Sequence, residues 1–524
     1  MAPKINPEMK MQIRYAFRHP VKFMKGADLP FERVRPWELA THMLTGLVGI
    51  RAGFFWQDMW LFQNLFHMPP SIQAVGQTVS GLFDGLNDPL IGAFMDTRSY
   101  KLNVHRWIVR INTIMSPIMR VLPMFNFGGI SHAQRIGLFI ACRCLNDLTG
   151  TPAGVSGTKL IVHTTGDSEQ RRKINWAQGI STTIHEMLAP LIWAVIGLRE
   201  VFGWSEYGII VLGAVIFAIP GMLLELGPTF IIQRVPDHIQ PKTGFGIKGV
   251  VNGIIESFRV TWYNRYFWLD NFSALARAVL PGVSEQDFYR YSNIDDVVNL
   301  GGARGEFLLF LRDNIVSLPQ NILMPFALPI IRKVGGPRNM QVLHEGISTV
   351  CNAARAAVGV HTFPRFLFHT SMEMFIRTFG RVQEVSGRMN QFEMLDYVEY
   401  KTGRRSEGAN MAVNGLKNKF ITNNIDAITG RLFLQFVLGF DPARGIGRGL
   451  DRDLDGNPID LPGQTETYIR YMPLMYLWMP VLRTFIVFVS RLLYRYPAEL
   501  RVKVEAELAE RRRLTEEAKE AIEV

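Results

Sequence analysis

Long apolar stretches recur along this sequence and limit its possible folds more than any other feature. The clearest runs from Tyr207 to Leu224 without a charged residue, close to the roughly 20 residues that a helix needs to cross a bilayer. One such stretch would also suit a buried helix of a soluble protein, but comparable stretches return at regular intervals. We therefore predict transmembrane spans near residues 38–64, 72–95, 105–126, 135–163, 174–198, 206–232, 262–283, 305–331, 340–361, 363–395, 407–438 and 469–494.

The charges between these spans follow the pattern of a membrane topology. Lys and Arg gather in alternate connections, for example at residues 98–106, 171–173 and 332–338, as is typical of short cytoplasmic loops. The connections between them are short or acidic. This pattern predicts a multi-pass protein of the cell (plasma or inner) membrane with both termini in the cytoplasm.

The predicted spans divide into two sets of six. We expect a basic cytoplasmic arm (1–36), a first six-helix bundle (37–233), a cytoplasmic linker (234–258), a second six-helix bundle (259–495) and a charged cytoplasmic helical tail (496–524). Two six-helix pseudo-repeats around a central cavity would suit a transporter. The expected fold class is an all-α membrane protein with twelve transmembrane helices.

Composition narrows the class of protein further. The mean hydropathy of +0.09 is low for a membrane protein, and we attribute it to charges inside the spans, the acidic segment 441–468 and the charged tails. The three cysteines form no CxxC motif, so a disulfide or structural metal is not expected. The net charge of +11 fits a cytoplasmic face attracted to anionic lipid better than nucleic-acid binding. No residues assemble into a hydrolytic site, so we expect neither an enzyme nor a cofactor.

Charged residues inside the second span mark a candidate ion site. A charge at mid-bilayer costs about 2.5–3.5 kcal/mol on the insertion scale, so such residues usually face a cavity or the bundle interior. Asp84, Asn87 and Asp88 share one helix face because they lie three and four residues apart. Their oxygens suit Na⁺, and two close carboxylates can also bind a proton. The alternative is a salt bridge to another helix, where Lys419 either complements the site or reaches the membrane surface.

Four passages carry a family resemblance. They are Phe83 to Gly92 followed by Asp96 to Ser99, Asp167 to Arg172, Asp396 to Gly408, and Tyr496 to Leu500. Together they resemble the glycoside-pentoside-hexuronide:cation symporters, the melibiose permease-like family of the major facilitator superfamily. The resemblance implies the major facilitator fold and a coupling ion, Na⁺ or H⁺, at Asp84, Asn87 and Asp88, with Lys419 interacting with that site.

Two cytoplasmic motifs belong to this resemblance. Gly92, Asp96 and Arg98 lie at the cytoplasmic end of the second span, where an acidic residue can pair with basic groups and hold two helices together. Asp396, Arg404 and Glu407 lie before the eleventh span. We expect both motifs to act in gating and not in substrate contact.

The resemblance departs from the family at the substrate site. Asp147 is the carboxylate nearest to the sugar-binding aspartate of the fourth helix, whereas Arg51 stands where the first helix has an aspartate. A guanidinium group pairs well with a carboxylate, so Arg51 suggests an acidic substrate such as a hexuronide. The alternative is that Arg51 pairs with Asp58 or with an acid of another helix. Trp56 and Trp60 either contact substrate or pack against lipid.

The sequence thus predicts a cation-coupled symporter that carries a sugar, glycoside or uronide by alternating access, as a monomer in the lipid bilayer. The alternatives are an uncoupled facilitator or a lipid or organic-anion transporter on the same fold, and a membrane sensor that does not transport.

One loop motif lies outside this scheme. Asp451 to Gly456 matches the opening of an EF-hand calcium loop, but Pro462 stands where the motif requires glutamate. We therefore favour an acidic external loop over a calcium site, and we expect no metal beyond a possible Na⁺ at Asp84 and Asp88.

Overall fold

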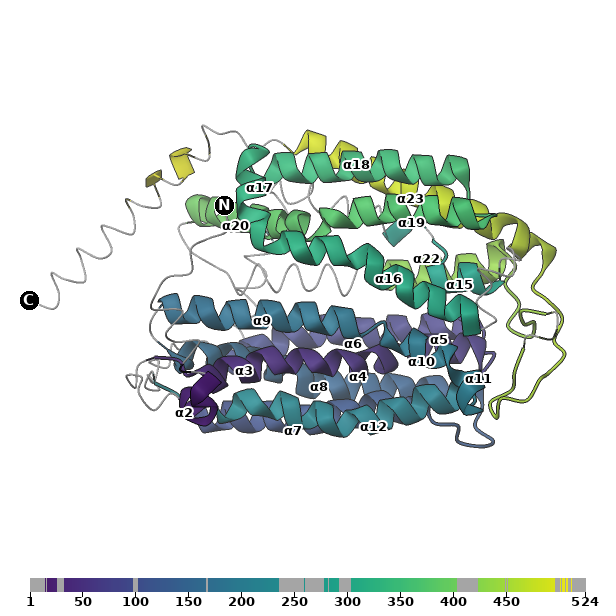
Figure 1. Cartoon of the computed structure of the whole chain (residues 1–524), viewed down its shortest axis with the longest axis horizontal. Coiled ribbons are helices and arrows are strands. Elements are labelled where there is room, and N and C mark those ends of the chain that lie inside the picture. Colours follow the sequence, from purple (N-terminus) through teal and green to yellow (C-terminus); the bar gives the residue numbers. More distant parts are fainter. Residues whose placement is uncertain are drawn as a thin grey trace, which may run out of the picture.

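The described part of the molecule is built of helices in two groups. The computed structural model describes residues 33–97, 102–165, 168–234, 282–291, 303–402, 423–447 and 451–494, with short pieces elsewhere. Within these residues no β-strand is present, and only two isolated β-bridges occur. Figure 1 shows the helices of the N-terminal half packed in one layer and those of the C-terminal half in the other.

In the N-terminal half the first span is broken into several short pieces, whereas the second, third and fourth are long helices. The elements are α2 (Pro20–Lys25), α3 (Pro36–Leu44), η1 (Thr45–Val48), α4 (Gly49–Phe55), α5 (Asp58–Asn64), α6 (Pro70–Thr97), α7 (Leu102–Val121), η2 (Leu122–Met124), α8 (His132–Thr164), α9 (Ser168–Leu188), α10 (Leu191–Gly197), α11 (Arg199–Phe202), α12 (Glu206–Leu226) and η3 (Gly227–Phe230).

The described part of the C-terminal half is also built of helices. Its described elements are α15 (Glu285–Tyr291), α16 (Ala303–Leu323), η4 (Met324–Phe326), α17 (Ala327–Lys333), α18 (Pro337–Val358), α19 (Phe363–Thr378), α20 (Gly380–Thr402), α22 (Asn423–Leu432), the π-helical η6 (Phe433–Val437) and α23 (Glu466–Leu493).

These helices coincide with most of the predicted spans. Most of the seventh span and the first half of the eleventh lie outside the described residues. The tenth span is two helices, because the chain leaves α19 at Phe379 before α20 begins. Among the described residues, Trp176–Gly197, Glu206–Phe230 and Glu466–Leu493 are long and apolar enough to cross a membrane, and the bent pair Phe310–Leu323 with Ala327–Lys333 adds a fourth. The other helices carry more charge, so the count of twelve stays a prediction.

Glycines fix the first span against α9. A Cβ atom added at Gly46 or Gly49 would lie 2.3 Å from the backbone oxygen of Ser181 or His185, and one at Gly53 would lie 2.1 Å from that of Ala189. Only glycine permits so close an approach, which is how small residues let membrane helices pack. The part of the first span before residue 56 is therefore held closely on α9.

Each half has its own apolar core. The N-terminal core gathers buried side chains such as Phe54, Leu61 and Ile196, and the C-terminal core gathers Tyr289, Tyr468 and others. Phe310 and Leu454 of the C-terminal half also pack against the N-terminal core, so the two halves touch there.

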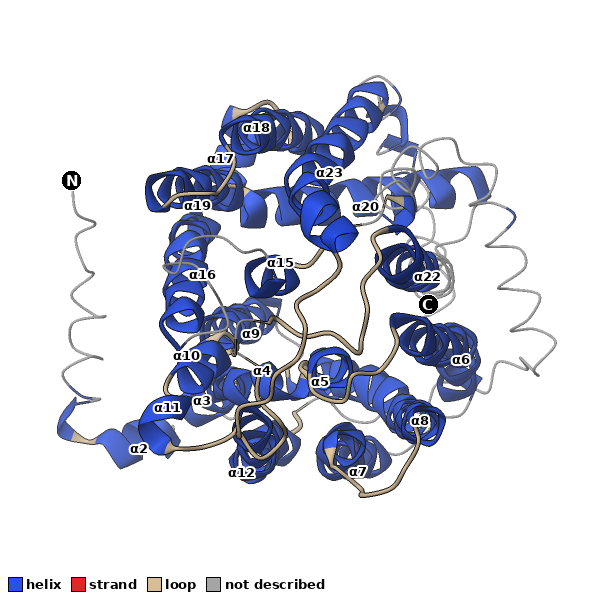
Figure 2. Ribbon diagram, turned by 90° about the vertical axis from the view of Figure 1, so that its right-hand side faces the viewer, coloured by secondary structure: helices blue, strands red, loops and turns tan. Residues whose placement is uncertain are grey.

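A folded loop crosses from one half to the other at one end of the bundle. We call residues 438–465 the strap and this end of the molecule the strap end. The carboxylate of Asp451 accepts hydrogen bonds from the backbone N–H groups of Ile446 and Gly447, both at 2.8 Å. At its tip, Leu454 packs against the N-terminal core, and a Cβ added at Gly456 would lie 3.2 Å from Ser205. Figure 2 shows the strap running from the α22 and α23 side toward α12.

Candidate functional site

Two polar cavities lie on either side of α5. The first, between the halves, has a volume of about 380 Å³, and we call it the interface cavity. The second lies among α5, α6, α8 and α22, has a volume of about 310 Å³, and we call it the ion cavity. Met59 of α5 lines both. Both volumes fall within or close to the usual range for small-molecule sites.

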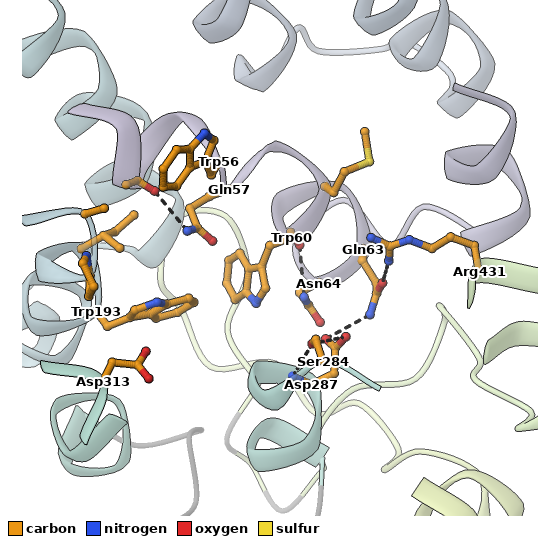
Figure 3. Close-up of a pocket in the computed structure, with 15 residues that line it drawn as sticks. Trp56, Gln57, Trp60, Gln63, Asn64, Trp193, Ser284, Asp287, Asp313 and Arg431 are labelled. Atoms are coloured by element: carbon orange, nitrogen blue, oxygen red, sulfur yellow. Dashed lines mark hydrogen bonds between the residues drawn. The ribbon is translucent and has the colours of Figure 1, made fainter. Parts of the chain in front are cut away.

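Tryptophans form the N-terminal wall of the interface cavity. Trp56, Trp60 and Trp193 all line it (Figure 3). The rings of Trp60 and Trp193 meet edge to face with centroids 6.1 Å apart. Arg290 of the C-terminal half lies over the Trp60 ring at 4.9 Å. This wall offers flat apolar surface to a ring-shaped ligand.

Polar groups form the opposite wall of the interface cavity. The amide of Gln63 donates to Asp287 at 3.2 Å and accepts from Arg431 at 2.5 Å, as Figure 3 shows. Ser284 also donates to Asp287, at 2.7 Å, and Asp313 of α16 lines the same cavity. These groups can hydrogen-bond to hydroxyls, and the bonds of Gln63 also join the two halves.

Further contacts join the halves at the strap end. The Tyr291 hydroxyl donates to Asn64, the backbone N–H of Ser71 donates to Gln435 at 2.8 Å, and the His67 ring lies 3.0 Å from the carbonyl oxygen of Pro442. Burial lowers the pKa of His67 below its ordinary value, and the Pro442 carbonyl partly opposes this shift. The halves are thus closed on one another at this end.

The ion cavity brings together two carboxylates that the sequence analysis singled out. Asp84 of α6 and Asp147 of α8 both line it, with Gln77, Ser80 and Arg143. Arg143 donates to Asp58 at 3.2 Å and lies over the Phe139 ring at 5.3 Å. A cavity with two carboxylates, an amide and a hydroxyl offers the oxygen ligands that small hard cations prefer.

The remaining predicted ion-site residues are only partly described. Asn87 is buried on α6, one turn after Asp84. Asp88 lies on the same helix, but its side chain is outside the described residues, as are all of Lys419, Arg98, Arg404 and Glu407. Gly92 and Asp96 lie on α6 and Asp396 lies on α20, with side-chain surroundings that are likewise outside the described part.

Arg51 lies apart from both cavities. It is buried and donates to Glu225 of α12 at 2.6 Å, so an acid of another helix is its partner, and Asp58 pairs with Arg143. Glu225 lines a third cavity of about 580 Å³ inside the N-terminal half. Arg51 is absent from the linings of the interface and ion cavities.

Several residues of these sites were not predicted from the sequence. Asp287, Asp313 and Arg431 line the interface cavity, and Arg143 lines the ion cavity. Arg143 precedes Asp147 by one helical turn, and this spacing could have predicted that the two side chains lie on the same face of α8. The residues of the C-terminal half meet the cavity only through tertiary packing.

A second buried charge cluster was also missed. Glu373 of α19 accepts from Arg355 at 3.0 Å and from Arg377 at 2.5 Å, and Arg312 pairs with both Glu373 and Glu285. Arg377 follows Glu373 by four residues inside the tenth predicted span, a spacing that indicates a pair on one helix face.

The loop that resembles an EF-hand uses its acids for internal hydrogen bonds. Asp451 binds the two backbone N–H groups already described, and Asp453 accepts from the backbone N–H groups of Asp455 at 3.0 Å and Asn457 at 2.7 Å. The side-chain amide of Asn457 also donates to Asp453, at 3.1 Å, and this bond is the main cause of the lowered pKa of Asp453. Among the described residues, no group of three or more His, Cys, Asp or Glu is placed to hold a metal ion.

Comparison with known proteins adds three kinds of finding. The sequence model of the family described as MFS/sugar transport protein matches residues 69–498. No curated protein matches the chain significantly. The fold is similar to that of the nucleoside transporter NupG, with a TM-score of 0.52, 14% identity and coverage of 88% of this chain and 100% of the other.

Two further solved structures have the same fold. A bacterial homologue of the iron transporter ferroportin, in an inward-facing state, gives a TM-score of 0.52 at 12% identity and covers 87% of this chain and 98% of its own. The xylose transporter XylE from E. coli, in a partially occluded inward-open conformation, gives 0.50 at 11% identity and covers 88% and 98%. At such low identities these likenesses show the fold alone.

Proposed function

The chain belongs to the MFS/sugar transport protein family, and from that premise we propose that it is a cation-coupled symporter of a sugar or glycoside. Its fold is that of the major facilitator superfamily, and it is an integral membrane protein. The observation that supports coupled transport is the pair of cavities on either side of α5. One cavity offers aromatic and polar walls to a substrate, and the other offers carboxylates to a cation.

The interface cavity supports a neutral ring-shaped substrate. Its tryptophans can pack against the apolar face of a sugar ring, while Asp287, Asp313 and Gln63 can accept or donate hydrogen bonds to hydroxyls. Among the described residues that line this cavity there are two carboxylates and one guanidinium group, that of Arg431, which already donates to Gln63. Since Arg51 is paired with Glu225, these surroundings favour a neutral glycoside over an acidic one.

The ion cavity supports coupling to Na⁺ or H⁺. A bound cation would offset the repulsion between Asp84 and Asp147 and lower the cost of burying them when the halves rearrange. Asn87 and Asp88 would complete the site from α6, and Lys419 would compete with the cation. Gly92, Asp96 and Arg98, with Asp396, Arg404 and Glu407, would hold the opposite end of the bundle closed. We place the strap end on the extracellular side of the membrane and both termini in the cytoplasm.

The proposal is tested by uptake into vesicles reconstituted with the full chain. A panel of neutral glycosides and uronides is offered under an imposed Na⁺ gradient and, separately, under a pH gradient. We expect one gradient to drive accumulation of a neutral glycoside. In Asp84→Asn, accumulation should be lost while exchange of substrate across the membrane persists, and the exposed Asp460→Asn serves as the matched control.

The alternatives give different results in the same assay. An uncoupled facilitator would exchange substrate at the same rate with or without either gradient. An organic-anion transporter would prefer the uronides, and Arg51→Ala would abolish that preference. A sensor that does not transport would exchange none of the panel.

A further inference from the structure

The short helix α5 touches both cavities, and its two ends bind different partners. At its start, Asp58 accepts from Arg143, whose side chain lines the ion cavity. At its end, Gln63 bonds to Asp287 and Arg431 of the C-terminal half. Between them, Met59 lines both cavities. One seven-residue helix therefore connects the candidate ion site to the substrate site and to the contacts that close the halves.

The chain before α5 is anchored separately. Trp56 and Gln57 leave the helical conformation, with ψ values of 1° and 4°. The hydrogen-bond pattern changes there, because the N–H of Gln57 donates to Phe54 three residues back and its side-chain amide donates to the carbonyl of Gly53. The preceding segment is held on α9 by its glycines, where a Cβ at Gly53 would lie 2.1 Å from Ala189. Consequently α5 can tilt about residues 56–57 while α4 stays in place, since a few terminal residues can absorb such a change.

Electrostatic interactions of Arg143 with the carboxylates around it can drive this tilt. Asp84 and Asp147 share the ion cavity with Arg143, and Arg120 is close enough to Asp58 and Asp147 to interact with both electrostatically. Asp84 and Asp147 therefore compete with Asp58 for the positive charge of Arg143. A cation bound beside Asp84 and Asp147 would weaken that competition and strengthen the existing pair of Arg143 with Asp58.

We propose that Asp58 and Arg143 are positioning residues that transmit ion occupancy to the substrate site through α5. This inference rests on the proposed cation-coupled function. When the cation binds, the Asp58–Arg143 pair tightens and fixes the orientation of α5. That orientation places Trp60 against the substrate and Gln63 against Asp287. The structure described here has the pair formed and the Gln63 contacts made, so the two ends of α5 are engaged together.

The test separates ion binding from its transmission. In purified full-length protein, Na⁺ or H⁺ binding is followed by the rise in Tm that the ion causes. Transmission is followed by the ion-induced change in tryptophan fluorescence that Trp60→Phe removes. Transmission is also followed through substrate affinity. The Kd of the glycoside that the vesicles take up is measured without and with the ion, and the first value is divided by the second. A coupling of this kind is expected to give a ratio of about 5–150 in the unaltered protein.

In Asp58→Asn we expect the ion to raise Tm as before, while the Trp60 response disappears and the ratio of Kd values falls to near one. Asp58→Glu should restore both, and Glu384→Gln, which removes a carboxylate paired with Arg381 at 2.7 Å on α20, should change neither. A normal Trp60 response and ratio in Asp58→Asn would overturn the inference alone. If the ion fails to raise Tm in the unaltered protein, the cation coupling is wrong and the inference falls with it.

Discussion

Each half of the molecule has a cluster of charged residues among its helices, and the two clusters differ in what surrounds their carboxylates. In the C-terminal half, Glu373 is enclosed by Arg312, Arg355 and Arg377. In the N-terminal half, Asp84 and Asp147 line a cavity of about 310 Å³ beside Arg143. A carboxylate enclosed by three guanidinium groups is fixed in charge and position, whereas carboxylates on a cavity can exchange a cation. On the proposed function, the C-terminal cluster maintains structure, whereas the N-terminal carboxylates would exchange the coupling cation.

The strongest test of this difference is removal of the central C-terminal charge. Glu373→Gln leaves the guanidinium groups of α16, α18 and α19 without their shared partner, and breaking a buried ion pair typically costs about 3–5 kcal/mol. We expect a large fall in Tm in detergent. Asp84→Asn, measured alongside, should leave Tm nearly unchanged. Equal effects of the two substitutions would remove the distinction between the halves.

Packing in the N-terminal half gives the next largest effect. In Gly53→Ala the new methyl group would lie 2.1 Å from the Ala189 oxygen, so α4 must move away from α9, and such overpacking costs about 1–3 kcal/mol. Gly154→Ala is the control, because nothing lies within 4 Å of its Cβ position. Thermal unfolding of both variants should show a lower Tm for Gly53→Ala only. An equal Tm for the two would mean that α4 is not held on α9 by this contact.

A substitution in the interface cavity tests how much the N-terminal half contributes to substrate binding. Trp60→Ala removes aromatic surface supplied by the N-terminal half, and we expect the transported glycoside to bind about tenfold more weakly, a loss of ~1.4 kcal/mol. Equilibrium binding measures this, with the exposed Trp107→Ala as control. Unchanged affinity in Trp60→Ala would place the substrate elsewhere.

The smallest expected effect concerns the contacts between halves at the strap end. Because burial lowers the pKa of His67 below its ordinary 6.5, the folded state disfavours the protonated ring. Stability is therefore full above pH 6.5 and is lost as the pH falls through the lower pKa of the folded state. Comparing Tm at about pH 8 and about pH 5 should show a smaller loss in His67→Gln than in the unaltered protein. Identical losses in the two proteins would show that His67 carries none of the pH dependence.

The sequence predicted the elements of the fold better than their interruptions. Hydropathy located most of the helices, because a span must be long and apolar to be detected. Hydropathy also predicted continuous spans over residues 38–64 and 363–395. In the structure the helix ends within each of these spans, at Trp56–Gln57 and at Phe379. Gly380 follows the second break directly, whereas Trp56 and Gln57 include no glycine or proline, so no local residue signals the first. Such breaks are set by packing against neighbouring helices.

The candidate site was predictable only within single helices. The spacing of Asp84 and Asn87 placed them near one another on α6, and the structure places Asp84 on a cavity and buries Asn87. The meeting of Asp84 with Asp147 depends on how α6 packs on α8, which one sequence does not contain. The same holds for Asp313, which reaches the tryptophans of the opposite half only in the folded molecule.

The strap has a mechanical consequence for a transporter that must open at this end. An extended chain covers about 3.3–3.6 Å per residue, and the strap does not use its full length, because Gly445 and Gly463 pair in a β-bridge and the residues between them double back. The surplus length is folded away by hydrogen bonds such as those of Asp451. Opening therefore need not stretch the backbone, but the contacts of Leu454, Gly456 and Pro442 with the opposite half have to break. Because both ends of the strap join elements of the C-terminal half, η6 and α23, the strap resists separation of the halves only through these contacts, and once they break it moves with the C-terminal half.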